Sequence, residues 1–119
     1  MRFKFPQKKN TAPRAVVLRD SEDAEGTRLL EASLSSDGDI LIQGRDYGDG
    51  VEKVLGLREY EWAWKIPAGH VPALLRALEA DDDVLSALKR RFSGNDAADL
   101  GQFLDAHGIA TEKWARLGD

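Results

Sequence analysis

The chain contains no cysteine, which excludes a disulfide framework and any metal site built on thiolates. It also lacks an apolar run long enough to span a bilayer, and its charged N-terminal residues do not include the apolar segment of a secretory signal. These absences favour a protein of the reducing cytoplasm with no membrane segment. The length of 119 residues predicts one domain, and a domain of this size buries about two-thirds of its unfolded surface.

Catalytic motifs are absent as well. Only two histidines occur, His70 and His107, and no H-E-x-x-H, G-x-S-x-G, P-loop or dinucleotide-binding pattern is present. Residues 46–52 have the acids and glycines of a calcium loop, but Gly48 stands where such a loop needs a ligand. The sequence therefore predicts a protein that is not an enzyme and that holds neither a metal nor a cofactor.

The strongest pattern that is present lies in residues 59–66, where large apolar side chains alternate with mostly polar ones. A period of two predicts a strand with one buried face and one face toward water. Each aromatic side chain can bury roughly 150–250 Å², so this strand supplies much of a small core. Pro67 ends the strand because it has no N–H to donate to a ladder. The apolar positions are Tyr60, Trp62, Trp64 and Ile66.

The chain before this strand reads as β-structure. We expect strands at residues 15–19, 27–35 and 39–46, with an acidic loop at residues 21–26. A two-residue Asp37-Gly38 turn would place polar residues opposite apolar ones on both faces. A three-residue loop, residues 36–38, instead sets Leu34 opposite Ile40 and gives one clean apolar face, with Gly38 in the left-handed position.

The chain after Pro67 reads as helix. A stripe at Val71, Leu74, Leu75 and Leu78 predicts a helix that starts near residues 68–69 and covers the aromatic strand. The acids at 81–83 cap a second helix that ends in the basic residues 89–91. Asn95 or Asp96 opens a third helix, which Gly108 ends, and residues 112–117 are expected to form a last short helical segment around Trp114.

These elements predict the α+β class: an N-terminal antiparallel meander of three to four strands, followed by three helices packed on one face. The charge pattern divides the chain further. Residues 1–14 contain five cations and no acid, whereas residues 15–119 carry all 21 acids and the other 12 of the 17 cations. We therefore expect a basic N-terminal arm before a single domain. The arm is either a solvated tail or, as the alternative function, a contact to nucleic acid.

One region gathers acidic residues around an aromatic one. A surface of this kind suits a basic protein partner, because complementary potentials speed and orient encounter. The competing interpretation is a charged face that only keeps the domain soluble. Glu59 and Glu61 lie about 6–7 Å apart along the strand, a spacing that glycosidases use, but nothing in the sequence indicates a cleft around them. The predicted partner-binding residues are Asp46, Tyr47, Asp49, Glu52, Glu59 and Glu61.

The run D-G-D-I-L-I-Q-G-R-D-Y-G at residues 37–48, followed by V-E at 51–52 and E-Y-E at 59–61, resembles a motif of small uncharacterised bacterial acidic proteins. Their pattern is a strand, G-D-L-x-I-x-G-x-D-L-G, V-E, E-Y-E and then helices, and it covers roughly residues 27–117 here. Tyr47 replaces an aliphatic residue of that pattern. These proteins are similar to immunity proteins, which bind and neutralise a toxin domain. The resemblance implies a non-enzymatic protein-interaction module.

Overall fold

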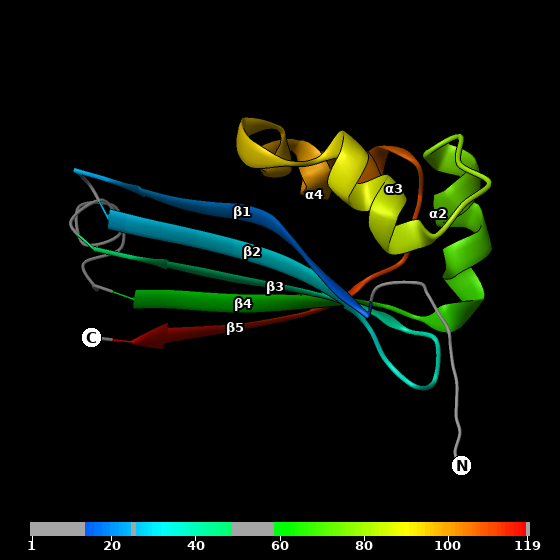
Figure 1. Ribbon diagram of the computed structural model, residues 1–119. Coiled ribbons are helices and arrows are strands. Elements are labelled where there is room, and N and C mark those ends of the chain that lie inside the picture. The colour runs from blue at the N-terminus through cyan, green and yellow to red at the C-terminus, as the bar shows by residue number, and fades with distance from the viewer. Residues whose placement is uncertain (1–13, 25, 49–58, 119) are drawn as a thin grey trace, which may run out of the picture.

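The computed structural model describes residues 14–24, 26–48 and 59–118, with side chains as far as residue 115. Within these residues, five antiparallel strands form one sheet in the order β1-β2-β3-β4-β5. β1 to β4 form a meander in chain order, and β5 returns after the helices to pair with β4 (Figure 1). The strands are β1 (Ala15–Asp23), β2 (Gly26–Leu34), β3 (Ile40–Tyr47), β4 (Glu59–Ile66) and β5 (Glu112–Gly118).

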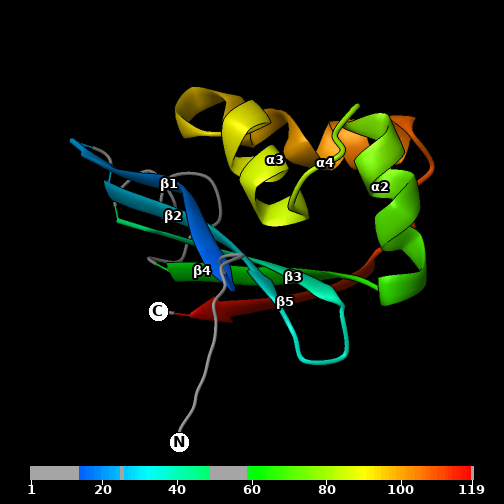
Figure 2. The ribbon, with the colours of Figure 1, turned by 45° about the vertical axis from the view of Figure 1, so that its right-hand side comes forward.

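The described helices all lie on one face of this sheet. A 3-10 turn, Ala68–His70, leads into α2 (Val71–Ala77), and α3 (Val84–Arg91) follows; a second 3-10 segment, η3 (Gly94–Asp99), leads into α4 (Leu100–Ala106). Both ribbon views show the helix layer above one face, with the β1–β2 end of the strands extending beyond it (Figures 1 and 2). The predicted α+β class is confirmed, and no described helix lies on the opposite face.

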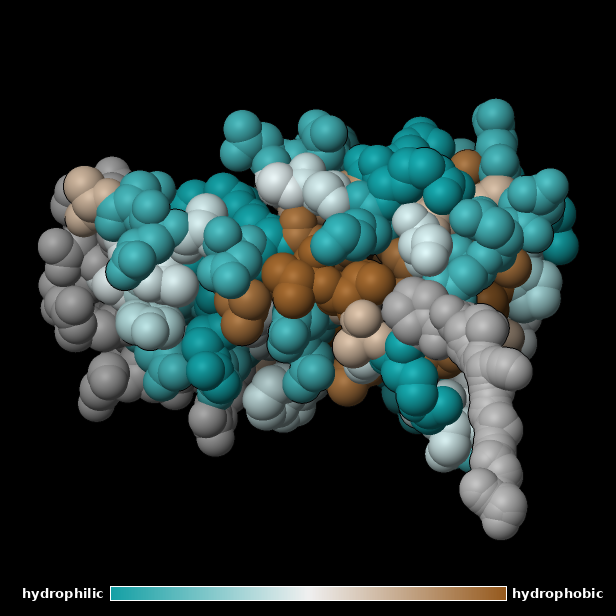
Figure 3. Space-filling model, viewed as in Figure 1, coloured by the Kyte–Doolittle hydropathy of each residue, from teal (hydrophilic) through white to brown (hydrophobic). Residues whose placement is uncertain are grey.

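The core lies between the sheet and the helices. Every second residue of the central strands points to the helices, as the alternation of a strand requires, and the helices present their apolar stripes in return. Figure 3 shows hydrophobic surface concentrated along the seam between β1 and the helix layer, while hydrophilic side chains cover most of the remaining view. The most buried large side chains are Leu18, Ile40, Ile42, Ile66, Leu74, Leu85, Leu88, Leu100 and Leu104.

The loop between β2 and β3 has the predicted three-residue form. Leu34 pairs with Ile40 and Ala32 with Ile42. The Ser35 N–H donates to the Asp39 carbonyl at 2.9 Å, and Gly38 has φ +90°. This prediction is confirmed, and the loop length sets which residues of β3 lie on the same face as the apolar residues of β2.

Two predicted helix caps are confirmed, whereas the third helix does not open at Asn95 or Asp96: a 3-10 segment runs over Gly94–Asp99, α4 begins at Leu100, and neither has a side-chain cap. The Asp83 carboxylate accepts a hydrogen bond from the Ser86 N–H at 2.8 Å at the start of α3. At the end of α4, Gly108 has φ +67° and the Ile109 N–H donates to the Leu104 carbonyl at 3.0 Å, which is a Schellman motif.

Two further expectations for local structure are wrong. Residues 112–117 form strand β5 rather than a helix, because an isolated helix this short is marginal and β4 has an edge that needs a partner. Residues 21–23 continue β1 rather than forming a loop, because their backbone pairs with β2 as far as Asp23 opposite Gly26. In both places sheet pairing overrides the local preference of the residues.

A β-bulge in β1 changes which residues of that strand face the helices. The register moves from Val17 opposite Glu31 to Arg19 opposite Leu30, so one extra residue, Leu18, is accommodated. Leu18 is buried in the core while Val17 is exposed. The bulge thereby places Arg19 on the helix side of the sheet, next to β2.

Candidate functional site

The sheet has an open face, which we define as the side opposite the helices. Cross-strand register identifies its members, because directly paired residues point to the same side. Tyr47 pairs with Glu59, Arg45 pairs with Glu61, and Ala63 lies between Gln43 and Trp114. The open face therefore brings together side chains from β2 to β5.

An ion pair occupies the centre of the open face. Arg45 donates from Nη2 to Glu61 Oε2 at 2.8 Å and from Nε to the same oxygen at 3.1 Å, and its Nε lies 3.9 Å from Glu59 Oε2. The hydrogen bond to Glu61 and the charge of that carboxylate raise the pKa of Arg45. The Glu61 side chain is only 15% exposed, so this carboxylate is held in place rather than free in solvent.

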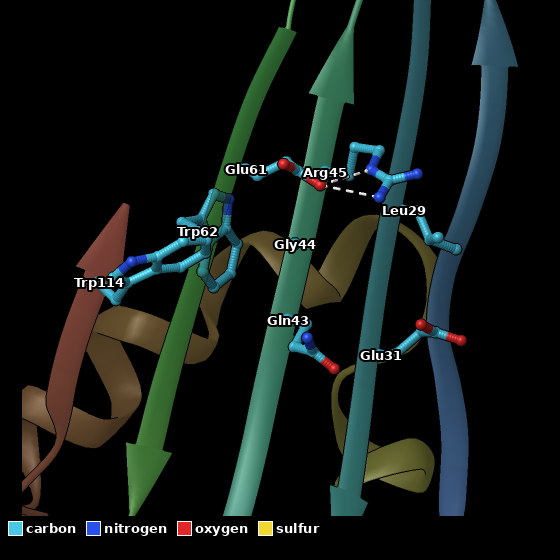
Figure 4. Close-up of a pocket in the computed structure, with 8 residues that line it drawn as sticks. All are labelled: Leu29, Glu31, Gln43, Gly44, Arg45, Glu61, Trp62 and Trp114. Carbon is cyan, nitrogen blue, oxygen red and sulfur yellow. Dashed lines mark hydrogen bonds and ion pairs between the residues drawn. The ribbon is translucent and has the colours of Figure 1, made fainter. Parts of the chain in front are cut away.

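A shallow hollow of about 320 Å³ surrounds this ion pair. Figure 4 shows Arg45 and Glu61 pointing toward one another, with Gln43 on β3, Glu31 on β2 and Trp114 on β5. The hollow thus offers carboxylate, amide, guanidinium and indole groups on one surface. Its lining residues are Leu29, Glu31, Gln43, Gly44, Arg45, Glu61, Trp62 and Trp114.

Two aromatic side chains of the open face are exposed. Trp114 is 55% exposed and Tyr47 is 45% exposed. They flank the Arg45–Glu61 pair along the strands, Tyr47 on the side of Glu59 and Trp114 on the side of Ala63. Tryptophan, tyrosine and arginine are the residues enriched at the energetic centres of protein interfaces.

The structure brings together three of the predicted partner-binding residues. Tyr47, Glu59 and Glu61 share the open face. Asp46 lies on the helix side, opposite Arg28 and Tyr60, because consecutive residues of a strand point to opposite faces. The expectation of one contiguous acidic surface is therefore wrong for Asp46. Asp49 and Glu52 lie outside the described residues, as does the basic arm up to residue 13.

Sequence reasoning missed other members of the site. Trp114 was assigned to a helix, so its place beside β4 was not foreseen. Arg45 and Gln43 were not singled out, although the predicted three-residue loop already set their face in β3 and only the β3–β4 register was lacking. The register of β3 with β4 is therefore the information that would have identified Arg45 and Gln43 as members of the site.

The two sides of the sheet differ in charge. Among the described side chains, the open face carries six acids and two cations, whereas the helix side carries three cations and two acids. An acidic face thus stands opposite a slightly basic one. The open-face groups are Asp20, Glu22, Glu31, Glu59, Glu61, Glu112, Arg45 and Lys65; the helix-side groups are Arg19, Arg28, Lys113, Asp23 and Asp46.

The basic residues at the end of α3 all have structural contacts. Arg90 binds the Asp82 carboxylate at 3.0 Å, Lys89 Nζ donates to the Val17 carbonyl at 3.3 Å, and Arg91 lies 4.8 Å from the centre of the Phe103 ring. The His107 ring also packs on Phe103, with centroids 4.4 Å apart. The described residues contain no cluster of three or more potential metal ligands.

No described helix is long and apolar enough to cross a membrane. Comparisons with protein-family models, with curated proteins and with solved structures found no match to the chain.

Proposed function

We propose that the protein is a non-enzymatic protein-interaction module that receives a basic protein partner on its open face. The observation that carries this proposal is the position of Tyr47 and Trp114 on a sheet face that no described helix covers. These two exposed aromatic side chains lie on either side of the Arg45–Glu61 ion pair. Large aromatic side chains exposed on one polar surface are typical of binding surfaces rather than of solubilising ones.

Each group on this face has a distinct role in the proposal. Trp114 and Tyr47 bury apolar area at little cost in side-chain entropy. The surrounding carboxylates steer a cationic partner and fix its orientation. Arg45, held by Glu61, presents a guanidinium that is already ordered, so less conformational freedom is lost when a partner binds.

The resemblance to immunity proteins makes a toxin domain the partner class we propose. A basic nuclease-like or membrane-directed toxin would present the cationic surface that this acidic face complements. Capture from an extract of the native host would identify this partner.

The test compares three variants of the full chain as bait in an extract of the native host. Trp114→Thr removes an exposed aromatic side chain, and Glu59→Lys reverses an open-face charge. Asp105→Lys makes the same change of charge at an exposed position of α4, on the other side of the sheet. The expected partner is captured by the wild type and by Asp105→Lys, and its capture is reduced by the two open-face variants.

Binding kinetics with the purified partner then test whether the open face is the binding site. Glu59→Lys should slow association at low salt, and the difference from wild type should shrink at high salt as both are screened. Trp114→Thr should mainly speed dissociation. If all three variants bind the partner with the same association and dissociation rates as the wild type, the open face is excluded as its binding site.

A further inference from the structure

A second surface lies on the helix side of the sheet, where the helix layer ends, and Trp62 is at its centre. The Trp62 indole covers Gly44 of the neighbouring strand so closely that a Cβ on Gly44 would lie 2.2 Å from the ring. The Trp64 ring, two residues further along β4, packs against the Trp62 ring, with the two ring centroids 4.5 Å apart. These contacts hold the indole in one position over β3.

Besides the open-face hollow, Trp62 lines two further hollows. One, of about 190 Å³, extends toward β1 and β2 and is closed on one side by the small residues Ala97 and Ala98 of η3. The other, of about 230 Å³, extends toward β5 and contains Lys113 and Tyr60. We call the first the Trp62 cleft; it is lined by Arg19, Arg28, Leu29, Leu30, Asp46, Trp62, Ala97 and Ala98.

Two guanidinium groups line the Trp62 cleft. Arg28 stands directly opposite Asp46, and the β1 bulge places Arg19 opposite Leu30, diagonal to Arg28 on the same side of the sheet. Diagonal neighbours of this kind are about 7–8 Å apart, a separation that one oxyanion can bridge with two long side chains. Within the described part of the chain, neither Arg19 nor Arg28 has a carboxylate at ion-pair distance, in contrast to Arg45 and Arg90.

Asp46 determines the net charge of the cleft. Its single carboxylate lies opposite Arg28, with Arg19 one strand further on, and the three groups together carry one net positive charge. A singly charged oxyanion balances this cluster, whereas a doubly charged phosphate would leave one negative charge in excess beside Asp46.

We propose that the Trp62 cleft binds a small aromatic carboxylate, with its oxygens between Arg19 and Arg28 and its ring against the Trp62 indole. Planar guanidinium groups bind carboxylates through paired N–H donors, and flat rings stack on indole with favourable geometry. A volume of about 190 Å³ is several times the roughly 30 Å³ share of one water molecule and accommodates a single ring with one carboxylate. Leu29 and Trp62 also line the open-face hollow, but the charged groups of the cleft, Arg19, Arg28 and Asp46, lie on the helix side of the sheet, so recognition of the carboxylate does not depend on the proposed protein-binding function.

The test titrates benzoate into the full-length chain and follows the Trp62 indole N–H by two-dimensional NMR. Benzamide tests the need for charge, because it has the same ring and shape without the anion. Acetate tests the need for the ring. Benzoate should bind at least fivefold more tightly than either, and the Trp62 signal should shift in proportion to occupancy.

Variants then assign the binding to named groups. Arg19→Gln with Arg28→Gln should weaken benzoate binding at least tenfold, while Arg76→Gln, an exposed position on α2, should leave it unchanged. Asp46→Asn should strengthen binding several-fold, because it removes the like charge. This opposite direction distinguishes electrostatic recognition from damage to the fold.

Several results would overturn the proposal. Equal binding of benzamide would remove the role of the arginines, and unchanged affinity in the double arginine variant would place benzoate elsewhere. Tighter binding of phenyl phosphate than of benzoate would mean a phosphate site instead. Binding of a single-stranded oligonucleotide that depends on Arg19 and Arg28, in the absence of benzoate binding, would assign the cleft to nucleic acid.

Discussion

The indole of Trp64 packs directly against the α-carbon of Gly101, where an added Cβ would lie 2.6 Å from the ring edge. This contact joins the central aromatic strand β4 to the last helix, α4. The Lys113 ammonium of β5 lies 5.6 Å from the centre of the same ring, within range of a cation–π interaction. Trp64 of β4 therefore contacts α4 and β5, two elements that come much later in the sequence.

The first prediction concerns this contact. Gly101→Ala should lower the free energy of unfolding by about 1 kcal/mol, because overpacking costs about 1–3 kcal/mol and the better helix propensity of alanine returns about 1 kcal/mol. Urea denaturation monitored by circular dichroism measures the change. In a Trp64→Phe background the smaller ring leaves room, so the same substitution should become stabilising.

Gly69→Ala is the matched control for this prediction, because nothing lies within 4 Å of a Cβ added there. It should leave stability unchanged or slightly raise it. If Gly101→Ala is as well tolerated as Gly69→Ala in the presence of Trp64, the two elements do not pack as closely as described.

The second prediction concerns the end of α2. Glu79 has φ +55°, and the Ala80 N–H donates to the Leu75 carbonyl at 3.0 Å, so a residue with a Cβ occupies the left-handed position of a Schellman motif. Glu79→Gly should raise the free energy of unfolding by about 0.5–1 kcal/mol, because the left-handed conformation costs other residues about 1–2 kcal/mol. Glu79→Ala keeps the Cβ and should give no such gain. Thermal melting of both variants distinguishes relief of strain from loss of a charge.

The third prediction concerns Asp46. Burial raises the pKa of its carboxyl above the usual 3.8, against the opposing effect of Arg28 and Arg19. The folded state therefore favours the protonated form, so the stability that this group contributes is complete below pH 3.8 and is lost as the pH rises through the folded-state pKa. Asp46→Asn, which mimics the protonated form, should have a higher melting temperature than wild type near neutral pH. The advantage should disappear as the pH falls below 3.8.

Exposed Asp20 on the open face provides the control for this pH profile. Asp20→Asn should shift the melting temperature little across the same range. A lower melting temperature of Asp46→Asn at neutral pH would mean that attraction to the two arginines outweighs desolvation, and would reverse the sign of the argument.

The sequence was sufficient to predict the elements that have a strong hydrophobic period or a defined helix cap. The alternation in Glu59–Ile66 predicted a strand with Trp62 and Trp64 on one face, and the parity argument fixed the register of β2 with β3. Both rest on interactions between residues close in sequence or on a short loop.

The sequence did not predict the structure of segments whose conformation is set by pairing with a strand distant in the sequence. Glu112–Gly118 has a capping residue before it and no strong alternation, so only the free edge of β4 explains its strand conformation. The same error hid Trp114 from the candidate site. Asp46 was grouped with Tyr47 because they are adjacent in sequence, although the pleat of β3 sends them to opposite faces.

The last prediction compares two tryptophans whose roles the fold separates. Trp114 is 55% exposed on β5, so Trp114→Thr should change the free energy of unfolding by less than about 0.5 kcal/mol, since threonine suits a strand and little buried area is lost. Trp64→Ala should cost about 3 kcal/mol, because it removes the ring that packs on Gly101 and Trp62. Urea denaturation of both variants tests the contrast. A similar loss of unfolding free energy for both variants would place Trp114 in the core, and the open face would then lack one of its two exposed aromatic side chains.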